Sequence, residues 1–126
     1  LEEMFSSITE ATAMSAMYAA THLNGVTAII ALTESGFTAK LMSRITSHLP
    51  IFSLSRHSHS RDKSALYRGV YPINFDSTSV ENPITEAIEV VKKSGHIKAG
   101  DLVILTHGDV METVGSSNTC KIIEVR

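Results

Sequence analysis

The spacing of hydrophobic residues along the chain alternates between two patterns. Residues 8–23 are rich in alanine and methionine and meet no strong breaker before Gly25, as expected of a helix that ends at a glycine. Residues 26–32 are almost continuously apolar, as in a strand buried on both faces. Continued along the chain, these patterns predict helices over residues 8–23, 37–48, 62–67 and 84–93, and strands over residues 26–32, 51–54, 69–75, 101–106 and 120–125.

The order of these elements predicts the fold class. Strands that alternate with helices form a mainly parallel sheet covered on both faces, so we expect an α/β domain. Pro72 lies within the third strand and favours an edge position for it. Only a loop, residues 107–119, joins the last two strands, so the last strand should pair antiparallel. Ligands in such folds bind beyond the carboxyl ends of the strands.

Composition narrows the class of protein further. The chain has 126 residues, which suits one domain over residues 1–126, and its net charge of -2 gives no basic excess for nucleic acid. No apolar run is long enough for a membrane span. The single cysteine, Cys120, forms no internal disulfide and fits a reducing, cytoplasmic location. The chain opens on Leu1 with no basic signal-peptide region, and we interpret it as a piece of a longer protein.

Residues 33–38 carry the strongest local signal for binding. They follow a predicted buried strand and open a predicted helix, where unpaired N–H groups and the positive end of the helix dipole favour anions. Gly36 lets the backbone approach a ligand, and hydroxyl donors come from Thr33, Ser35 and Thr38. Two interpretations remain open: a phosphate-binding loop, or an ordinary helix start that Ser35 caps.

A second segment, residues 115–119, ends the long loop before the last strand. Its Gly, Ser and Asn content suits a tight turn between neighbouring strands. The functional alternative is a loop that folds over a ligand. The segment consists of Gly115, Ser116, Ser117, Asn118 and Thr119.

Other polar residues give weaker signals. His57 and His59 have no Cys, Asp or Glu at a recognisable metal-ligand spacing, so we expect no metal site. Ser55, His57 and Asp62 include the residue types of a hydrolase triad but lack a nucleophile-elbow motif. Arg56 and Arg61 either solvate a loop or bind anions beside the second strand.

Taken together, the segments resemble the C-terminal domain of pyruvate kinases, and most closely the bacterial type that AMP and sugar monophosphates activate. Each motif is weak by itself, but the ordered set is specific and covers nearly the whole chain. The matching stretches are GVTAII (25–30), TESG (33–36), RI (44–45), LPI (49–51), LYRGVYP (66–72), AGDLVI (99–104) and GSSNT (115–119).

The resemblance implies a three-layer α/β/α domain with a five-stranded mixed sheet whose last strand is antiparallel. It implies a parent enzyme that transfers a phosphoryl group from phosphoenolpyruvate to ADP with Mg²⁺ and often K⁺, on a barrel domain absent from this chain. It also implies that this domain holds no catalytic residue, cofactor or metal, binds a phosphorylated effector and joins subunits of a homo-oligomer. The alternative is a self-contained phosphate-metabolite-binding protein of the same fold.

The resemblance assigns the effector phosphate to Thr33, Ser35, Gly36 and Thr38, and the covering loop to residues 115–119. One departure from the family concerns the second phosphate of fructose 1,6-bisphosphate, which other members hold with a basic residue after the third strand. Residues 73–91 contain no Arg, Lys or Trp. We therefore expect a monophosphate effector.

Overall fold

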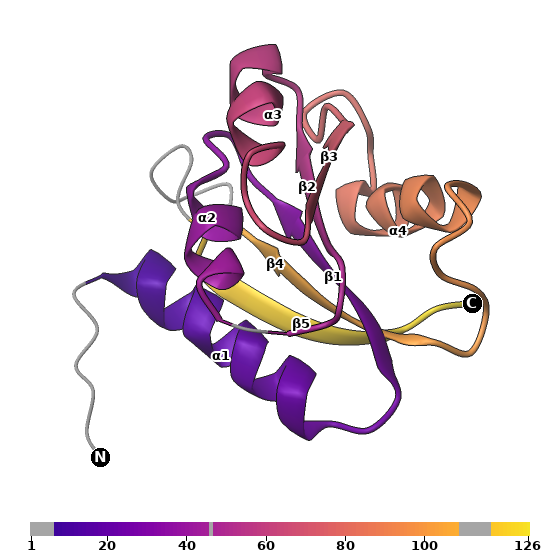
Figure 1. Ribbon diagram of the computed structural model, residues 1–126. Coiled ribbons are helices and arrows are strands. Elements are labelled where there is room, and N and C mark those ends of the chain that lie inside the picture. The colour runs from indigo at the N-terminus through magenta and orange to yellow at the C-terminus, as the bar shows by residue number, and fades with distance from the viewer. Residues whose placement is uncertain (1–6, 46, 109–116) are drawn as a thin grey trace.

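Five strands form one mixed sheet in the computed structural model, which describes residues 7–45, 47–108 and 117–126. β1 pairs in parallel with β2 and β4, β2 pairs in parallel with β3, and β5 runs antiparallel to β4 (Figure 1). The strands are β1 (Val26–Leu32), β2 (Ile51–Ser55), β3 (Val70–Asn74), β4 (Leu102–His107) and β5 (Thr119–Glu124), in the spatial order β3-β2-β1-β4-β5.

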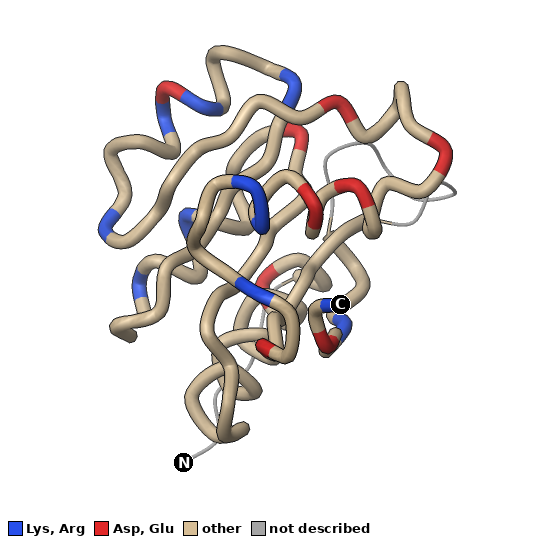
Figure 2. The backbone as a smooth tube through the Cα atoms, turned by 90° about the vertical axis from the view of Figure 1, so that its right-hand side faces the viewer, with Lys and Arg blue, Asp and Glu red and all other residues tan. Residues whose placement is uncertain are grey.

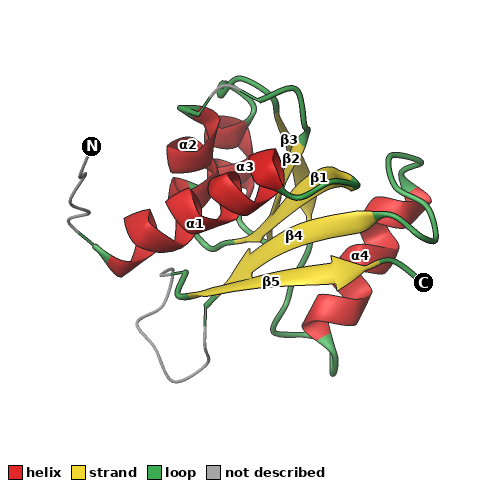
Figure 3. Ribbon diagram, turned by 90° about the horizontal axis from the view of Figure 1, so that it is seen from below, coloured by secondary structure: helices red, strands yellow, loops and turns green. Residues whose placement is uncertain are grey.

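Helices cover both faces of this sheet and make three layers. Figure 3 shows α1, α2 and α3 on one face and α4 on the other. This arrangement confirms the predicted α/β/α class, and the antiparallel β5 and the edge position of β3 with its Pro72 are confirmed too. The helices are α1 (Ile8–His22), α2 (Phe37–Ser43), α3 (Ser58–Ser64) and α4 (Pro83–Lys93).

The central strand β1 supplies side chains to two separate cores. Ile29 and Ala31 pack in the core under α1 and α2, whereas Ile30 and Leu32 pack in the core under α4. Successive side chains of a strand point to opposite faces, so a strand buried on both faces is apolar throughout. Burying an Ile or Leu side chain contributes about 1.5–3 kcal/mol, so these two cores hold the sheet between its helical layers.

Two predicted helices have different bounds in the structure. α2 ends at Ser43 instead of residue 48, because Arg44 and Ile45 donate to carbonyls only three residues back, which tightens and closes the last turn. α3 spans Ser58–Ser64, whereas we predicted a loop followed by a helix over 62–67. α3 buries only Ser60 and Ser64, so it carries no apolar stripe that the sequence could reveal.

Candidate functional site

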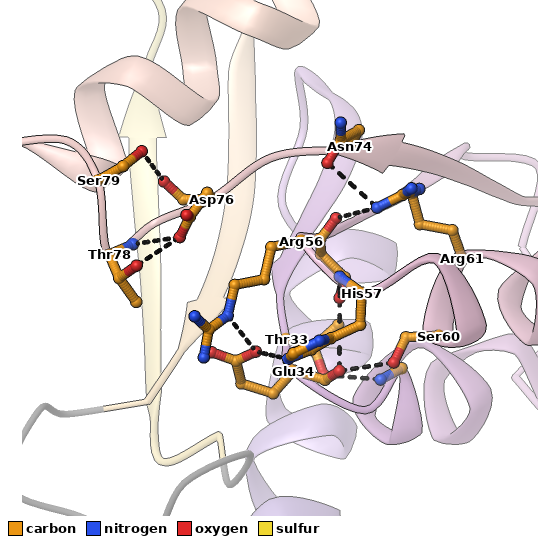
Figure 4. Close-up of polar contacts among 12 residues, drawn as sticks. Thr33, Glu34, Arg56, His57, Ser60, Arg61, Asn74, Asp76, Thr78 and Ser79 are labelled. Carbon is orange, nitrogen blue, oxygen red and sulfur yellow. Dashed lines mark hydrogen bonds and ion pairs between the residues drawn. The ribbon is translucent and has the colours of Figure 1, made fainter.

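The segment from Thr33 to Thr38 lies where the parallel strands end. It leaves β1 and enters α2, and the carboxyl ends of β2 and β3 lie on the same side of the sheet (Figure 4). Residues that follow these strands contact the segment. Open α/β sheets bind their ligands at this edge, beyond the carboxyl ends of the strands. The position agrees with the prediction from sequence.

The hydroxyls of this segment accept hydrogen bonds from its own backbone. Gly36 N donates to Thr33 Oγ1 at 3.0 Å, and Phe37 N donates to Ser35 Oγ at 3.2 Å. Ser35 therefore does satisfy an N–H group of the first turn, as the capping interpretation expects. Each hydroxyl that accepts a bond still carries its own proton, which it can donate to an anion.

Gly36 turns the chain into α2 with a left-handed backbone, φ 81° and ψ 0°. A Cβ atom at this position would lie 2.8 Å from Ser64 Oγ of α3. Glycine is therefore required both for the left-handed conformation and for the close approach of α3.

Thr38 connects the two predicted site segments. Its Oγ1 lies 2.7 Å from Ser117 Oγ, across 79 residues of sequence, and both side chains are buried. Asn118 N donates to His107 O at 3.1 Å, which places Ser117 beside the carboxyl end of β4. Thr119 begins β5, and its Oγ1 donates to Asn118 Oδ1 at 2.8 Å.

The structure therefore brings Ser117 against the first segment, and Asn118 and Thr119 follow it into β5. Gly115 and Ser116, the other two predicted loop residues, lie outside the described residues.

Two buried polar atoms at the end of β4 have no hydrogen-bond partner among the described residues. They are Thr106 Oγ1 and His107 Nε2. Thr106 follows Ile104 on the sheet face that α1 and α2 cover, the same face as Thr38. Buried polar atoms without partners are rare, and they leave unused hydrogen-bonding capacity at this strand end.

Glu34 forms contacts that the sequence alone did not predict. Its carboxylate Oε2 accepts from Arg56 Nε at 3.2 Å and lies 2.7 Å from His57 Nε2 (Figure 4). Its backbone carbonyl accepts from Ser60 Oγ at 2.6 Å and from Ser55 Oγ at 3.4 Å. The available signal was the placement of residues 56–60 directly after β2, the strand beside β1.

Arg61 and Asp76 complete the polar surface beyond β2 and β3. Arg61 Nη1 donates to Ser55 O and to Asn74 Oδ1, each at 3.1 Å. Hydrogen bonds from the Thr78 side chain and backbone lower the pKa of Asp76, and the positive charge of Arg56 lowers this pKa further. These residues carry both signs of charge at the strand ends.

The chain matches the family described as "Pyruvate kinase, alpha/beta domain" over residues 10–123. This match covers nearly the whole chain, and the fold has the element order and mixed sheet that the sequence resemblance implied. The chain belongs to this pyruvate kinase domain family.

Pyruvate kinases from several organisms are similar to the chain. It is 54% identical over 127 residues to "Pyruvate kinase II" of Salmonella typhimurium, 51% identical over 126 residues to a pyruvate kinase of Buchnera aphidicola subsp. Baizongia pistaciae, and 43% identical over 126 residues to that of Haemophilus influenzae. Each alignment covers 99% of this chain and 26% of the relative. The chain therefore spans about a quarter of the length of these pyruvate kinases.

Within the described residues of this pyruvate kinase domain, no helix has both the length and the apolar character needed to cross a bilayer.

Proposed function

We propose that the chain is the regulatory and assembly domain of a pyruvate kinase that works in the cytoplasm. The parent enzyme transfers the phosphoryl group of phosphoenolpyruvate to ADP on another domain. This domain binds AMP or a sugar monophosphate, with the phosphate held by Thr33, Ser35, Gly36 and Thr38. Residues 115–119 cover the bound effector.

The contact between Thr38 and Ser117 is the observation that carries this proposal. It joins the two segments that the sequence singled out independently, and the joint lies at the carboxyl ends of the strands. The segment places the hydroxyls of Thr33, Ser35 and Thr38 at the start of α2, where Phe37 N donates to Ser35 Oγ and the next first-turn N–H groups have no partner within their own helix. Such a set of donors suits a phosphate monoester.

A single phosphate fits the charges nearby. Residues 73–91 supply no basic side chain. Among the described residues, the arginines at positions 56 and 61, which follow β2, already have partners. Arg56 pairs with Glu34, and Arg61 donates to Ser55 O and Asn74 Oδ1. A second phosphate would have to displace these contacts, so we expect monophosphates to bind at least as tightly as a bisphosphate.

Catalysis belongs to the rest of the parent enzyme in this proposal. Phosphoryl transfer needs carboxylates and a lysine that position Mg²⁺ and the moving phosphoryl group. Among the described residues, no three His, Cys, Asp or Glu side chains gather so that they could hold a metal ion. As the sequence resemblance implies, we place the Mg²⁺ and K⁺ of the parent on its other domains, and we expect no turnover of phosphoenolpyruvate and ADP by the 126-residue chain.

Calorimetric titration of the chain with AMP, ribose 5-phosphate and fructose 1,6-bisphosphate tests the effector site. A hydrogen bond to a charged group contributes about 1.5–3 kcal/mol, so Ser35→Ala should weaken monophosphate binding roughly tenfold or more. Ser43→Ala is the matched control, because Ser43 Oγ donates to Lys40 O at the other end of α2. Equal affinities for wild type and Ser35→Ala would show that Ser35 only caps the helix. Much tighter binding of the bisphosphate would contradict the monophosphate preference.

Exposed apolar side chains on α1 support the assembly role. Tyr18 is 67% exposed, and a hollow of about 200 Å³ beside it is lined by Met14, Met17, Thr21 and Ile45. The opposite side of α1 is buried against the sheet, so the helix is apolar on two sides. An exposed apolar side of a helix is favourably buried against a partner, and a second copy of the chain, in a symmetric contact, would bury this face.

Sedimentation across a range of protein concentrations tests the assembly. We expect Tyr18→Ser to shift the equilibrium toward monomer, because the tyrosine ring is the largest exposed apolar group of that face. Leu66→Ser is the control, since Leu66 is 85% exposed but follows α3 instead of lying on α1. A monomeric wild type at every concentration, or equal effects of the two substitutions, contradicts assembly through α1.

A further inference from the structure

Glu34 is the one acidic residue of the segment at residues 33–38, and it lies between the hydroxyl residues assigned to the phosphate. A carboxylate at this place opposes the binding of a phosphate dianion. Its Oε2 atom is held by two basic groups, Arg56 Nε at 3.2 Å and His57 Nε2 at 2.7 Å. The charge of the segment is therefore set by residues that come from the end of β2.

The backbone of Glu34 is held from the same direction as its side chain. Ser60 Oγ of α3 donates to the Glu34 carbonyl at 2.6 Å, and Ser55 Oγ at the end of β2 donates to it at 3.4 Å. In Figure 4 the side chains of Arg56 and His57 converge on the Glu34 carboxylate. The backbone and the side chain of Glu34 are thus both held by hydrogen bonds or ion pairs, and its carboxylate points toward the segment after β2.

The pairing changes the electrostatics of the proposed site. Arg56 cancels the charge of Glu34, so these two side chains together carry no net charge. Figure 2 shows both acidic and basic positions along the described backbone, with several acidic positions at the upper right of the view. An uncompensated charge about 8 Å from an anion changes its affinity by roughly 30-fold at an effective dielectric constant of about 20, and by about 3–10-fold after screening by salt.

We propose that Arg56, assisted by His57, is a positioning residue for effector binding: it holds the Glu34 carboxylate away from the phosphate and cancels its charge. This inference rests on the proposed effector site and adds the residues that keep that site receptive to an anion. Arg56 acts through Glu34 and makes no contact with the effector. Its removal matters only while Glu34 carries a charge.

A double-mutant cycle on the 126-residue chain tests this dependence, with ribose 5-phosphate as the probe in calorimetric titrations. Arg56→Ala should weaken binding about 3–10-fold, because it exposes the phosphate to an uncompensated carboxylate. Glu34→Gln should bind as tightly as wild type or more tightly. The double variant Glu34→Gln/Arg56→Ala should bind within about threefold of Glu34→Gln. Adding Glu34→Gln should thus restore the affinity that Arg56→Ala loses.

This restoration separates positioning from a merely structural role. The double variant lacks the ion pair between Arg56 and Glu34 just as Arg56→Ala does, so an affinity loss caused only by the missing contact would persist in it. Arg56→Lys, which keeps the positive charge, should retain most of the affinity. Arg68→Ala is the control for net charge, because Arg68 is exposed just before β3, at the opposite end of the parallel strands.

The outcomes distinguish this inference from the proposed function. A double variant as weak as Arg56→Ala would show that Arg56 either contacts the effector or has a merely structural role, and would overturn the inference while leaving the site in place. Wild-type affinity in Arg56→Ala, or an equal loss in Arg68→Ala, would also overturn the inference alone. A wild-type chain that binds neither ribose 5-phosphate nor AMP would overturn the proposed effector site, and the inference with it.

Discussion

Replacing Gly36 by alanine tests how tightly the candidate site is packed against α3. Gly36 has φ 81°, and a Cβ atom there would lie 2.8 Å from Ser64 Oγ. Ser64 is fully buried, and its Oγ pairs with Ser53 Oγ at 3.2 Å. The substitution therefore imposes a strained backbone and also forces a buried hydroxyl pair apart.

The expected cost follows from these two effects. An L-residue in the left-handed region costs about 1–2 kcal/mol, partly offset by about 0.4–1 kcal/mol because alanine also restricts the unfolded chain. Leaving a buried hydroxyl without its partner costs about 1–3 kcal/mol. We expect Gly36→Ala to lower the free energy of unfolding by about 2–4 kcal/mol in total, or roughly 6–15 °C in Tm for a chain of this size.

Denaturant unfolding of purified variants measures this cost, and Gly69→Ala is the matched control. Gly69 has φ 71°, but a Cβ atom there would meet nothing within 4 Å, so only the backbone strain applies. We expect Gly69→Ala to cost about 1 kcal/mol. In a Ser64→Ala background the clashing oxygen is gone, and the cost of Gly36→Ala should fall to that of Gly69→Ala. Equal costs for Gly36→Ala and Gly69→Ala in the wild-type background would refute the packing explanation.

Two further measurements test other contacts of the site region. Thr38→Val and Ser117→Ala should each lower the free energy of unfolding by about 1–3 kcal/mol, because each leaves a buried hydroxyl unpaired. The double variant should lose clearly less than the sum of the two single losses. Additive losses would show that the 2.7 Å contact between the two hydroxyls does not couple them energetically. Hydrogen bonds from Thr78 lower the pKa of Asp76, so this carboxylate stabilises the fold above the pKa of the unfolded chain and loses that contribution as the pH falls through its lowered pKa. Asp76→Asn should therefore be less stable than wild type near pH 6, and the difference should shrink as the pH approaches 3; a constant difference across this range would contradict the assignment.

The sequence by itself determined the sheet and its layers. Central strands of a parallel sheet are buried on both faces, so the apolar run at residues 26–32 matches β1 in both of its bounds. Pro72 marked the edge strand, because proline has no N–H to donate and fits best where that side of the strand has no partner. The connection between the last two strands predicted the antiparallel direction of β5, since it is too short for a helical crossover with its turns. These features are local or periodic, and periodic patterns are visible in a single sequence.

The sequence also located the two candidate segments, but it did not predict that they contact each other. Thr33, Ser35, Gly36 and Thr38 were singled out as a strand-to-helix junction, and residues 115–119 as a separate loop. Only the tertiary structure brings Thr38 and Ser117 into contact, because the pairing of β1 with β4 places segments 79 residues apart at one edge of the sheet.

The helix α3 and the pairing of Glu34 were decided by tertiary structure alone. α3 buries Ser60, which donates to the Glu34 carbonyl, and Ser64, which pairs with Ser53 of β2. Its sequence therefore shows no apolar stripe and was predicted in part as a loop. Arg56 and Arg61 could be assigned either to solvent or to an anion, because nothing in their own neighbourhood along the chain distinguishes the two. Their partners lie on neighbouring strands and the segments that follow them, and only the order of strands in the folded sheet determines which charges meet.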